Sequence, residues 1–131
     1  VMQGASIVGH DVIVDGSNVN VGSGSAKAAV DLAADADSVK VEVVTPGGQV
    51  VDSFNLGPQS QGRVPFQWDS SAYADQSNLG FRVTATSGGK AVTATPMMGS
   101  AVSAVNTNDG ALNLELANGM TIPYSQVKAV S

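Results

Sequence analysis

The side chains of this chain that could take part in catalysis are few, and the only histidine is His10. A nucleophilic serine needs a base beside it, and no serine here stands in the GxSxG context of a nucleophile elbow. Zinc sites draw on several His or Cys ligands, and the chain contains no cysteine. We therefore expect His10 to be an exposed strand or turn residue, and we do not expect an enzyme. We assign no catalytic, cofactor-binding or metal-binding residue.

Aspartates gather in two short stretches that could supply calcium ligands. They are Asp31, Asp35 and Asp37 in DLAADAD, and Asp11 with Asp15 earlier in the chain. Calcium takes at least about six oxygens from a shaped loop, and DLAADAD lacks the sixth-position glycine and the twelfth-position glutamate of an EF-hand. The pattern is more typical of turn-forming aspartates on a solvated surface.

Glycoside hydrolysis requires two carboxylates facing each other across a cleft. Glu42 and Glu115, the only glutamates, lie on the polar sides of expected strands in different segments, so we do not expect a dyad. GSGSAK (residues 22–27) has glycines beside a lysine, but its spacing differs from that of a phosphate-binding P-loop. We interpret GSGSAK as a flexible linker and a domain boundary.

The stretch GRVPFQWD (residues 62–69) contains the only tryptophan, which is the main candidate for a ligand platform. An exposed tryptophan can stack on sugar rings in carbohydrate-binding sandwiches. In a strand, however, alternate side chains point the same way, so Val64, Phe66 and Trp68 would share one face. An apolar face of this kind predicts a core position for Trp68, with Asp69 starting the next turn. The exposure of Trp68 separates the two interpretations.

The composition favours strands and turns and argues against several kinds of partner. Charged residues make up 13% of the 131 residues, and the net charge is −5. We expect no nucleic-acid binding, because phosphate contacts need clustered Lys and Arg. No apolar run approaches the roughly 18 residues typical of a membrane span, so no membrane association is expected. The opening VMQGAS lacks the pattern of a secretory signal, and we expect a fragment of a longer protein.

The elements that would position these residues are short strands between turns. SVKVEVV (residues 38–44) places its valines on one face and Lys40 with Glu42 on the other, and PGG (residues 46–48) turns the chain into a second strand. FRVTAT (residues 81–86) alternates in the same way. About six or seven such strands predict a β-sandwich of the immunoglobulin or fibronectin type III kind.

Further strands are expected at both ends of the chain. Residues 6–15 are predicted as one strand with Gly9 at a bulge, and MMGSAVSAV as a separate strand. ALNLELANGMTIP reads as a hairpin around a two-residue turn at Asn118-Gly119.

Neither end of the chain is large enough to fold by itself. We therefore predict a discontinuous small barrel made of residues 1–24 and 97–131. The sandwich of residues 25–96 would be inserted into this barrel. Met97 and Met98 are then expected to pack between the two domains.

Several motifs occur in an order that resembles a known family. They are ASIVG (residues 5–9), TPGGQVV (45–51), LG (56–57), G-x-x-x-F-x-W-D (62–69), G-F-x-V-x-A (80–85) and LANGMTIPYSQV (116–127). In this combination the chain resembles the flagellar hook-capping, or basal-body rod modification, protein family. It departs from the family pattern at Ser70, where glycine is frequent, and at Phe81, where tyrosine is frequent. These departures concern the turns of the sandwich.

The resemblance implies an all-β fold, with a small Tudor-like barrel and an inserted immunoglobulin or fibronectin type III-like sandwich. It implies a scaffold that caps the growing bacterial flagellar hook and guides polymerisation of hook subunits, without a catalytic role or a cofactor. Expected partners are the hook subunit and further copies in a cap oligomer, a pentamer, of the full-length protein. The expected location is extracellular, at the hook tip, after export by the flagellar type III system. The alternative is a secreted β-sandwich module that binds a glycan or a cell-surface ligand.

Overall fold

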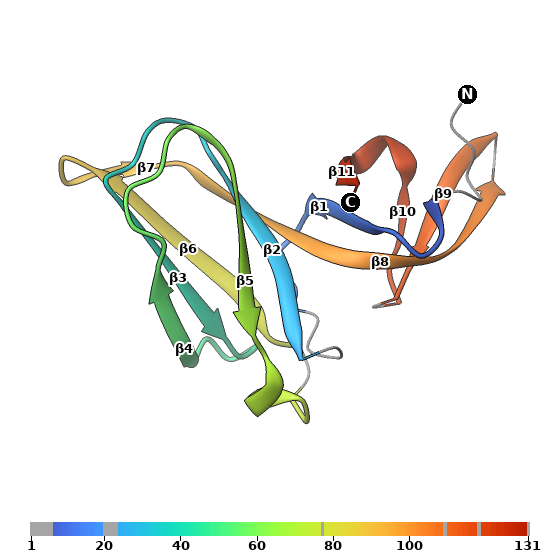
Figure 1. Ribbon diagram of the computed structural model, residues 1–131, viewed down its shortest axis with the longest axis horizontal. Coiled ribbons are helices and arrows are strands. Elements are labelled where there is room, and N and C mark those ends of the chain that lie inside the picture. Colours follow the sequence, from blue (N-terminus) through green and yellow to red (C-terminus); the bar gives the residue numbers. More distant parts are fainter. Residues whose placement is uncertain (1–6, 20–23, 77, 109, 118, 131) are drawn as a thin grey trace. The chain divides into compact units, whose positions relative to one another are not determined.

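The computed structural model describes residues 7–19, 24–76, 78–108, 110–117 and 119–130, and nearly all of its regular structure is β-strand (Figure 1). This confirms the predicted all-β class. Within these residues, no helix is long and apolar enough to cross a membrane. The elements in chain order are β1 (Asp11–Asp15), β2 (Ser25–Leu32), β3 (Ser38–Val44), β4 (Val50–Asn55), β5 (Gly62–Asp69), η1 (Ser71–Tyr73), β6 (Gly80–Ser87), β7 (Lys90–Val92), β8 (Ala94–Asn108), β9 (Ala111–Leu116), β10 (Thr121–Pro123), η2 (Tyr124–Gln126) and β11 (Val127–Val130), where η1 and η2 are 3-10 turns.

The chain divides into two compact units. One runs from Gly16 to Met98, and the other contains the residues up to Asp15 together with those from Gly99 onwards. The long strand β8 passes through the boundary and contributes to both units (Figure 1). Independent folding of two domains, with limits at residues 24/25 and 96/97, stays a prediction.

The Gly16–Met98 unit is a sandwich of two sheets. One sheet has the strand order β4-β3-β6-β7, and in the other β2 pairs with β5 on one side and with the first part of β8 on the other. Alternation along β3 explains why this strand forms, because Val39, Val41 and Val43 are fully buried while the residues between them point away from the core. These valines lie in the core of the sandwich, as the period-two pattern predicts.

The hairpin predicted at PGG is confirmed. Val44 pairs with Val50, and inside this pair the Thr45 N–H donates to the Gln49 carbonyl at 2.9 Å. The Gln49 N–H in turn donates to the Thr45 hydroxyl at 3.1 Å. Gly48 has a φ of +89°, a conformation that residues with a side chain rarely adopt, which explains why glycine closes the turn.

The other unit is built on strands in the order β10-β9-β8-β1-β11, which curl into a half-barrel. The strand β11 lies beside β1, with Val12 opposite Val130, so the two ends of the chain are joined in one sheet. Its buried side chains include Val12, Leu114, Leu116 and Ile122. The resemblance implies a small Tudor-like barrel made from both ends of the chain, and the structure has a half-barrel made from both ends; β11 itself was not expected.

The prediction of one strand over residues 6–15 is wrong. The strand β1 begins only at Asp11, and the residues before it form a turn in which the His10 N–H donates to the Ile7 carbonyl at 3.0 Å. Gly9 in this turn has a φ of +90° and donates its N–H to a carbonyl of β8. The apolar alternation before Asp11 therefore belongs to a turn that is held by tertiary contact.

The strand predicted at MMGSAVSAV is confirmed, but it is not a separate strand. It lies inside β8, which runs without interruption for 15 residues. The physical reason is long-range pairing, since β8 pairs with β2 over its first part and with β9 over its last part. Pairing with two strands that are far apart in sequence, β2 and β9, keeps β8 extended through Pro96, Met97 and Met98.

The expected two-residue turn at Asn118-Gly119 involves Asn118, which lies outside the described residues. Around it, the Gly119 N–H donates to the Leu116 carbonyl at 2.9 Å, and the Leu116 N–H donates to the Met120 carbonyl at 2.8 Å. The pairing therefore closes at Leu116 and Met120, which leaves a connection one residue longer than a two-residue turn.

Candidate functional site

Trp68, the candidate ligand platform, lies in the core of the sandwich. Its exposed fraction is 4%, and its neighbour on the same face of β5, Phe66, is also buried. The indole meets Phe81 edge-on with 6.3 Å between ring centroids, and Phe66 meets Phe81 in the same way at 5.3 Å. The prediction of a core face on β5 is confirmed. A ring buried to this degree cannot lie flat against a sugar, which removes the observation that favoured a glycan-binding module.

Hydrogen bonds from the Trp68 and Tyr73 side chains link the two sheets beside the buried indole. The Trp68 Nε1–H donates to Asp52 Oδ2 at 2.7 Å, which links β5 to β4. The Tyr73 ring lies over the indole with 5.1 Å between centroids, and its hydroxyl donates to the Val51 carbonyl at 3.1 Å. Both β4 and β5 are edge strands of their sheets, so these bonds connect the two sheets along one edge of the sandwich. An inward-pointing charge such as Asp52 also discourages pairing of an edge strand with other chains.

A shallow hollow of about 340 Å³ lies among three connections of the sandwich, those between β2 and β3, β4 and β5, and β6 and β7. We call it the loop hollow. Ala36 and Gln59 exchange two backbone hydrogen bonds, each 2.9 Å long, which tie the first two connections together. The Gln59 side chain further donates to the Leu56 carbonyl at 2.7 Å. The residues that line the hollow are Asp35, Ala36, Asp37, Pro58, Gln59, Ser60 and Ser87.

Two of the candidate calcium ligands hold the loop hollow together instead. Asp35 Oδ1 accepts the Gln61 N–H at 2.8 Å, and Asp37 Oδ2 accepts the Gly88 N–H at 2.8 Å. Both aspartates therefore accept from backbone N–H groups of other connections and join separate loops, whereas the pattern suggested acceptors within their own turn. Over the described part of the chain, no group of three or more His, Cys, Asp or Glu side chains is placed to hold a metal ion.

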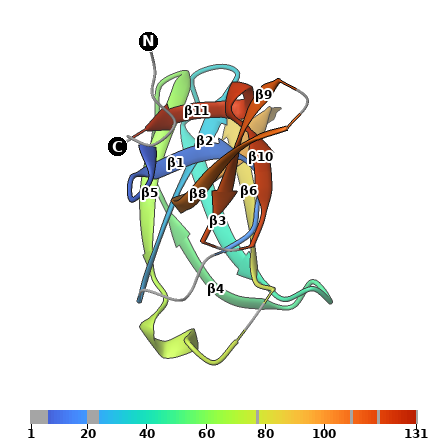
Figure 2. The same cartoon turned by 90° about the vertical axis from the view of Figure 1, so that its right-hand side faces the viewer.

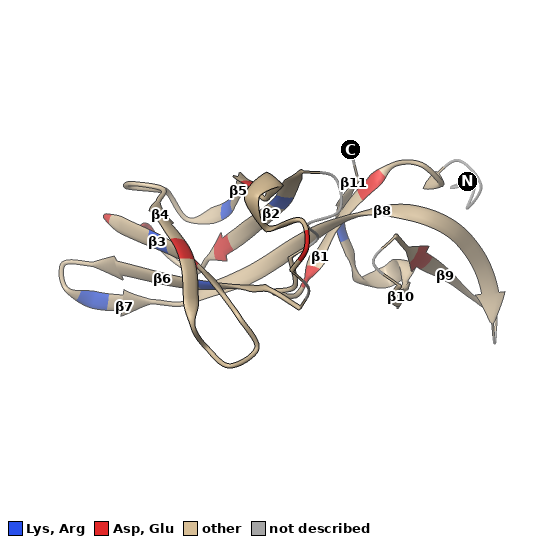
Figure 3. Cartoon of the chain, turned by 90° about the horizontal axis from the view of Figure 1, so that it is seen from below, with Lys and Arg blue, Asp and Glu red and all other residues tan. Residues whose placement is uncertain are grey.

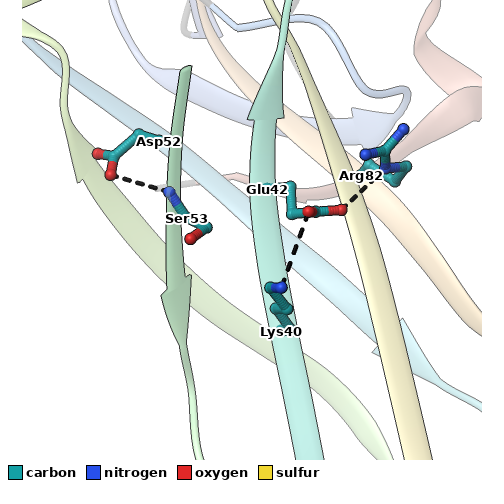
Figure 4. A network of polar contacts seen from close by, with 5 residues as sticks. All are labelled: Lys40, Glu42, Asp52, Ser53 and Arg82. Carbon is teal, nitrogen blue, oxygen red and sulfur yellow. Dashed lines mark hydrogen bonds and ion pairs between the residues drawn. The ribbon is translucent and has the colours of Figure 1, made fainter. Parts of the chain in front are cut away.

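An exposed charge network lies on the outer face of β3 and β6. Arg82 Nε donates to Glu42 Oε1 at 2.9 Å, and Lys40 Nζ lies 3.8 Å from Glu42 Oε2 (Figure 4). The hydrogen bond from Arg82 is the main cause that holds the pKa of Glu42 below its ordinary value of 4.5. Partial desolvation of the carboxylate raises this pKa, and the positive charges of Arg82 and Lys40 lower it further. Glu42 lies in the sandwich and Glu115 in the other unit, where Glu115 Oε2 accepts from Asn106 Nδ2 at 3.0 Å; the absence of a dyad stays a prediction.

The remaining candidates from the sequence have structural surroundings. His10 is exposed in the turn before β1, as predicted. Met97 and Met98 are buried and lie opposite small residues of β2; packing between two domains stays a prediction. Of the expected linker GSGSAK, residues 22–23 lie outside the described residues, and residues 25–27 belong to β2, so the linker interpretation is wrong for those three. Acidic and basic residues are spread along the strands (Figure 3).

Comparison with known proteins decides the family. Residues 16–89, more than half of the chain, match the model of a family described as the FlgD Ig-like domain. The chain belongs to this family. The match begins at the first residue of the sandwich unit and ends in its β6–β7 turn. The predicted resemblance to the hook-capping protein family is therefore confirmed.

Relatives of the family extend the similarity beyond the matched residues. The basal-body rod modification protein FlgD of Escherichia coli (strain K12) is 25% identical over 98% of this chain, and the chain spans 61% of that protein's length. The crystal structure of FlgD from P. aeruginosa is 29% identical, with a TM-score of 0.73, over 95% of this chain and 98% of that one. FlgD from Xanthomonas campestris is 28% identical, with a TM-score of 0.79, over 98% of this chain and 96% of that one; its structure is described as giving insights into the hook capping essential for flagellar assembly.

The loop hollow is a feature that sequence reasoning missed. The paired turns around Asp35 and Pro58 were visible as turns, but nothing local shows that they meet. The pairing of Ala36 with Gln59 joins loops that are separated by a complete hairpin. Only the closure of the sandwich brings them together.

Proposed function

We propose that this chain is the core part of a cap protein that assembles the bacterial flagellar hook by guiding hook-subunit polymerisation at the growing tip. The observation that carries the proposal is the match of residues 16–89 to the FlgD Ig-like domain family. The similarity to the Xanthomonas campestris FlgD structure over 98% of the chain supports it, since that protein is linked to hook capping. The role is structural and needs no cofactor.

The proposed partners are the hook subunit and further copies of the full-length protein in a cap oligomer, a pentamer by resemblance. The proposed location is outside the cell at the hook tip, after export by the flagellar type III system. A cap must hold subunits weakly enough to let them rearrange. Weak contacts repeated around an oligomer give a strong attachment in total while each one can break. A polar surface with 13% charged residues suits such contacts, because interfaces need not be unusually hydrophobic.

We place part of the contact surface on the exposed loops of both units, and in the sandwich on the loop hollow. Loops carry binding residues more often than the strands that support them. The backbone bonds between Ala36 and Gln59, and those that Asp35 and Asp37 accept, hold these loops in one shape. A preformed surface loses little conformational freedom on binding, which favours contact there.

Deletion of the gene for the full-length protein, followed by electron microscopy of hooks, tests the function. We expect no hooks in the deletion and normal hooks after return of the wild-type gene. Normal hooks in the deletion strain would remove the proposal.

The place of the contact surface needs matched variants of the returned gene. Ser60→Tyr fills the loop hollow from an exposed position, and Thr84→Tyr puts the same side chain on the exposed face of β6. We expect fewer hooks with Ser60→Tyr and wild-type numbers with Thr84→Tyr, at equal protein levels. Equal hook numbers for both variants would exclude the loop hollow but leave the capping function standing.

A further inference from the structure

The segment after β5, residues 70–76, covers the indole of Trp68, and we call it the strap. It contains η1, which lies beyond the end of β5 (Figure 2). Its internal hydrogen bonds are those of turns: the Tyr73 N–H donates to the Ser70 carbonyl and the Gln76 N–H to the Tyr73 carbonyl, both at 2.9 Å. At its start the strap is tied down: the Ser70 N–H donates to the Gly24 carbonyl at 3.1 Å, and the Ser71 N–H and hydroxyl donate to Asp69 Oδ1 at 3.0 and 2.7 Å. Bonds within a turn do not tie a segment to a sheet, so other contacts must hold residues 72–76 in place.

Beyond Ser71, a single side chain holds the strap against the sandwich. Of the described residues between Ser70 and Leu79, both of which are buried, Tyr73 is the only one that is not exposed. Its ring lies over the indole of Trp68 at 5.1 Å, and its hydroxyl donates to the Val51 carbonyl at 3.1 Å. Residues 72–76 are therefore held to the sandwich by one ring contact and one hydrogen bond of Tyr73.

The first residue of the strap, Ser70, has a buried hydroxyl that lacks a hydrogen bond in the described structure. Ser70 is fully buried, and its hydroxyl has no hydrogen-bond partner in the described structure. Nearly all buried polar groups in folded proteins are hydrogen-bonded, because an unpaired one has lost its water without a replacement. Opening of the strap would return this hydroxyl to water, so the closed state is less favourable than its contacts alone suggest.

Trp68 has supports that do not involve the strap. Its Nε1–H donates to Asp52 on β4, and its ring meets Phe81 on β6. Its backbone is paired with Ala26 of β2. These contacts hold the indole in position when the strap is removed.

We propose that the strap opens as a local unit and exposes Trp68 to solvent while the sandwich stays folded. Segments with few buried contacts open at lower free energy than the whole domain, and the strap is such a segment. The open state presents an apolar indole face that the closed protein hides. This inference rests on the contacts of the sandwich and is independent of the proposed capping function.

Quenching of tryptophan fluorescence by acrylamide tests the proposal, because Trp68 is the only tryptophan. We expect the quenching constant to rise several-fold in Tyr73→Ala, which removes the ring, and less in Tyr73→Phe, which removes only the hydroxyl. Tyr124→Phe, the same hydroxyl loss on a half-buried tyrosine of the other unit, should leave it unchanged. Far-UV circular dichroism should stay that of the folded protein in all three. An unchanged quenching constant in folded Tyr73→Ala would overturn the proposal.

Native-state hydrogen exchange of the wild-type chain gives an answer even if Tyr73→Ala does not fold. We expect the Tyr73 and Gln76 amides to exchange through an opening whose rate does not depend on low concentrations of urea. The Val41 amide in the centre of the sandwich should exchange through an opening that urea promotes. If the strap amides showed the same urea dependence as Val41, the strap would open only with the whole sandwich, and the proposal would be wrong.

Discussion

Replacement of Trp68 with alanine tests its place in the core and can be given a magnitude. Truncation of a buried Phe or Trp to alanine costs about 3–5 kcal/mol through lost packing and the cavity left behind. At 4% exposure, with ring contacts to Phe81 and Tyr73, Trp68 belongs near the upper end of that range. The substitution also leaves Asp52 Oδ2 without its indole donor. Because Asp52 is only half-buried, water replaces part of that bond, and about 1 kcal/mol is added.

A loss of about 5–6 kcal/mol is large for this sandwich. Domains are stable by roughly 0.05–0.15 kcal/mol per residue, which is about 4–12 kcal/mol for a unit the size of Gly16–Met98. We therefore expect Trp68→Ala to be unfolded in this unit, or to unfold at a much lower urea concentration. Trp68→Phe keeps a ring and should lose about half as much.

The assay is urea unfolding followed by far-UV circular dichroism, since the substitution removes the fluorophore. Arg82→Ala, on the exposed outer face of β6, is the control and should shift the midpoint little. A folded Trp68→Ala with the wild-type midpoint would refute the core assignment. If that variant also lost a carbohydrate interaction present in the wild type, Trp68 would be a ligand platform after all.

Three further measurements follow from single positions. Ser70→Ala removes the unpaired buried hydroxyl and should raise the free energy of unfolding by about 1 kcal/mol; a lower thermal midpoint would mean that the hydroxyl has a partner. Gly16→Ala places a Cβ 2.9 Å from Met98 Sδ at a φ of +149° and should lower the free energy of unfolding by about 1–3 kcal/mol; wild-type stability would contradict this strain. Hydrogen bonds from Ser71, first from its hydroxyl and then from its N–H, lower the pKa of Asp69 below its ordinary value of 3.8. The stability that these bonds add is therefore fully present above pH 3.8, and it is lost as the pH falls through the lowered pKa. An NMR titration of the Asp69 carboxyl checks this, with Ser71→Ala expected to return the midpoint toward 3.8; a wild-type midpoint at or above 3.8 would count against it.

Local patterns were reliable where one strand had one buried face. The valines of β3 predicted their own burial, because alternate side chains of a strand must point to opposite faces. The same rule placed Phe66 and Trp68 in the core without any knowledge of what covers them. The turn at PGG was visible because glycine at Gly48 marks a backbone conformation that other residues avoid.

Local patterns failed where the outcome depended on partners far away in the chain. The alternation before Asp11 resembled a strand, but the carbonyl that the Gly9 N–H meets belongs to β8. The junction around Met97 and Met98 resembled a break between two strands, whereas pairing with β2 and then β9 keeps β8 extended through it, even though the compact units change at Met98. No local sequence pattern predicts the loop hollow, because its walls come from three separate connections.

Composition and spacing alone were enough for the all-β class, the sandwich strands, the core position of Trp68 and, through the order of the motifs, the family. These properties depend on side-chain periodicity and turn chemistry, which act over a few residues. Tertiary structure alone decided the continuity of β8, the closure of β11 on β1, and the loop hollow. It also decided that Tyr73 lies over the indole of Trp68 and donates its hydroxyl to the Val51 carbonyl of β4. Each of these requires two segments distant in sequence to meet, and a meeting of that kind is set by the packing of the whole domain.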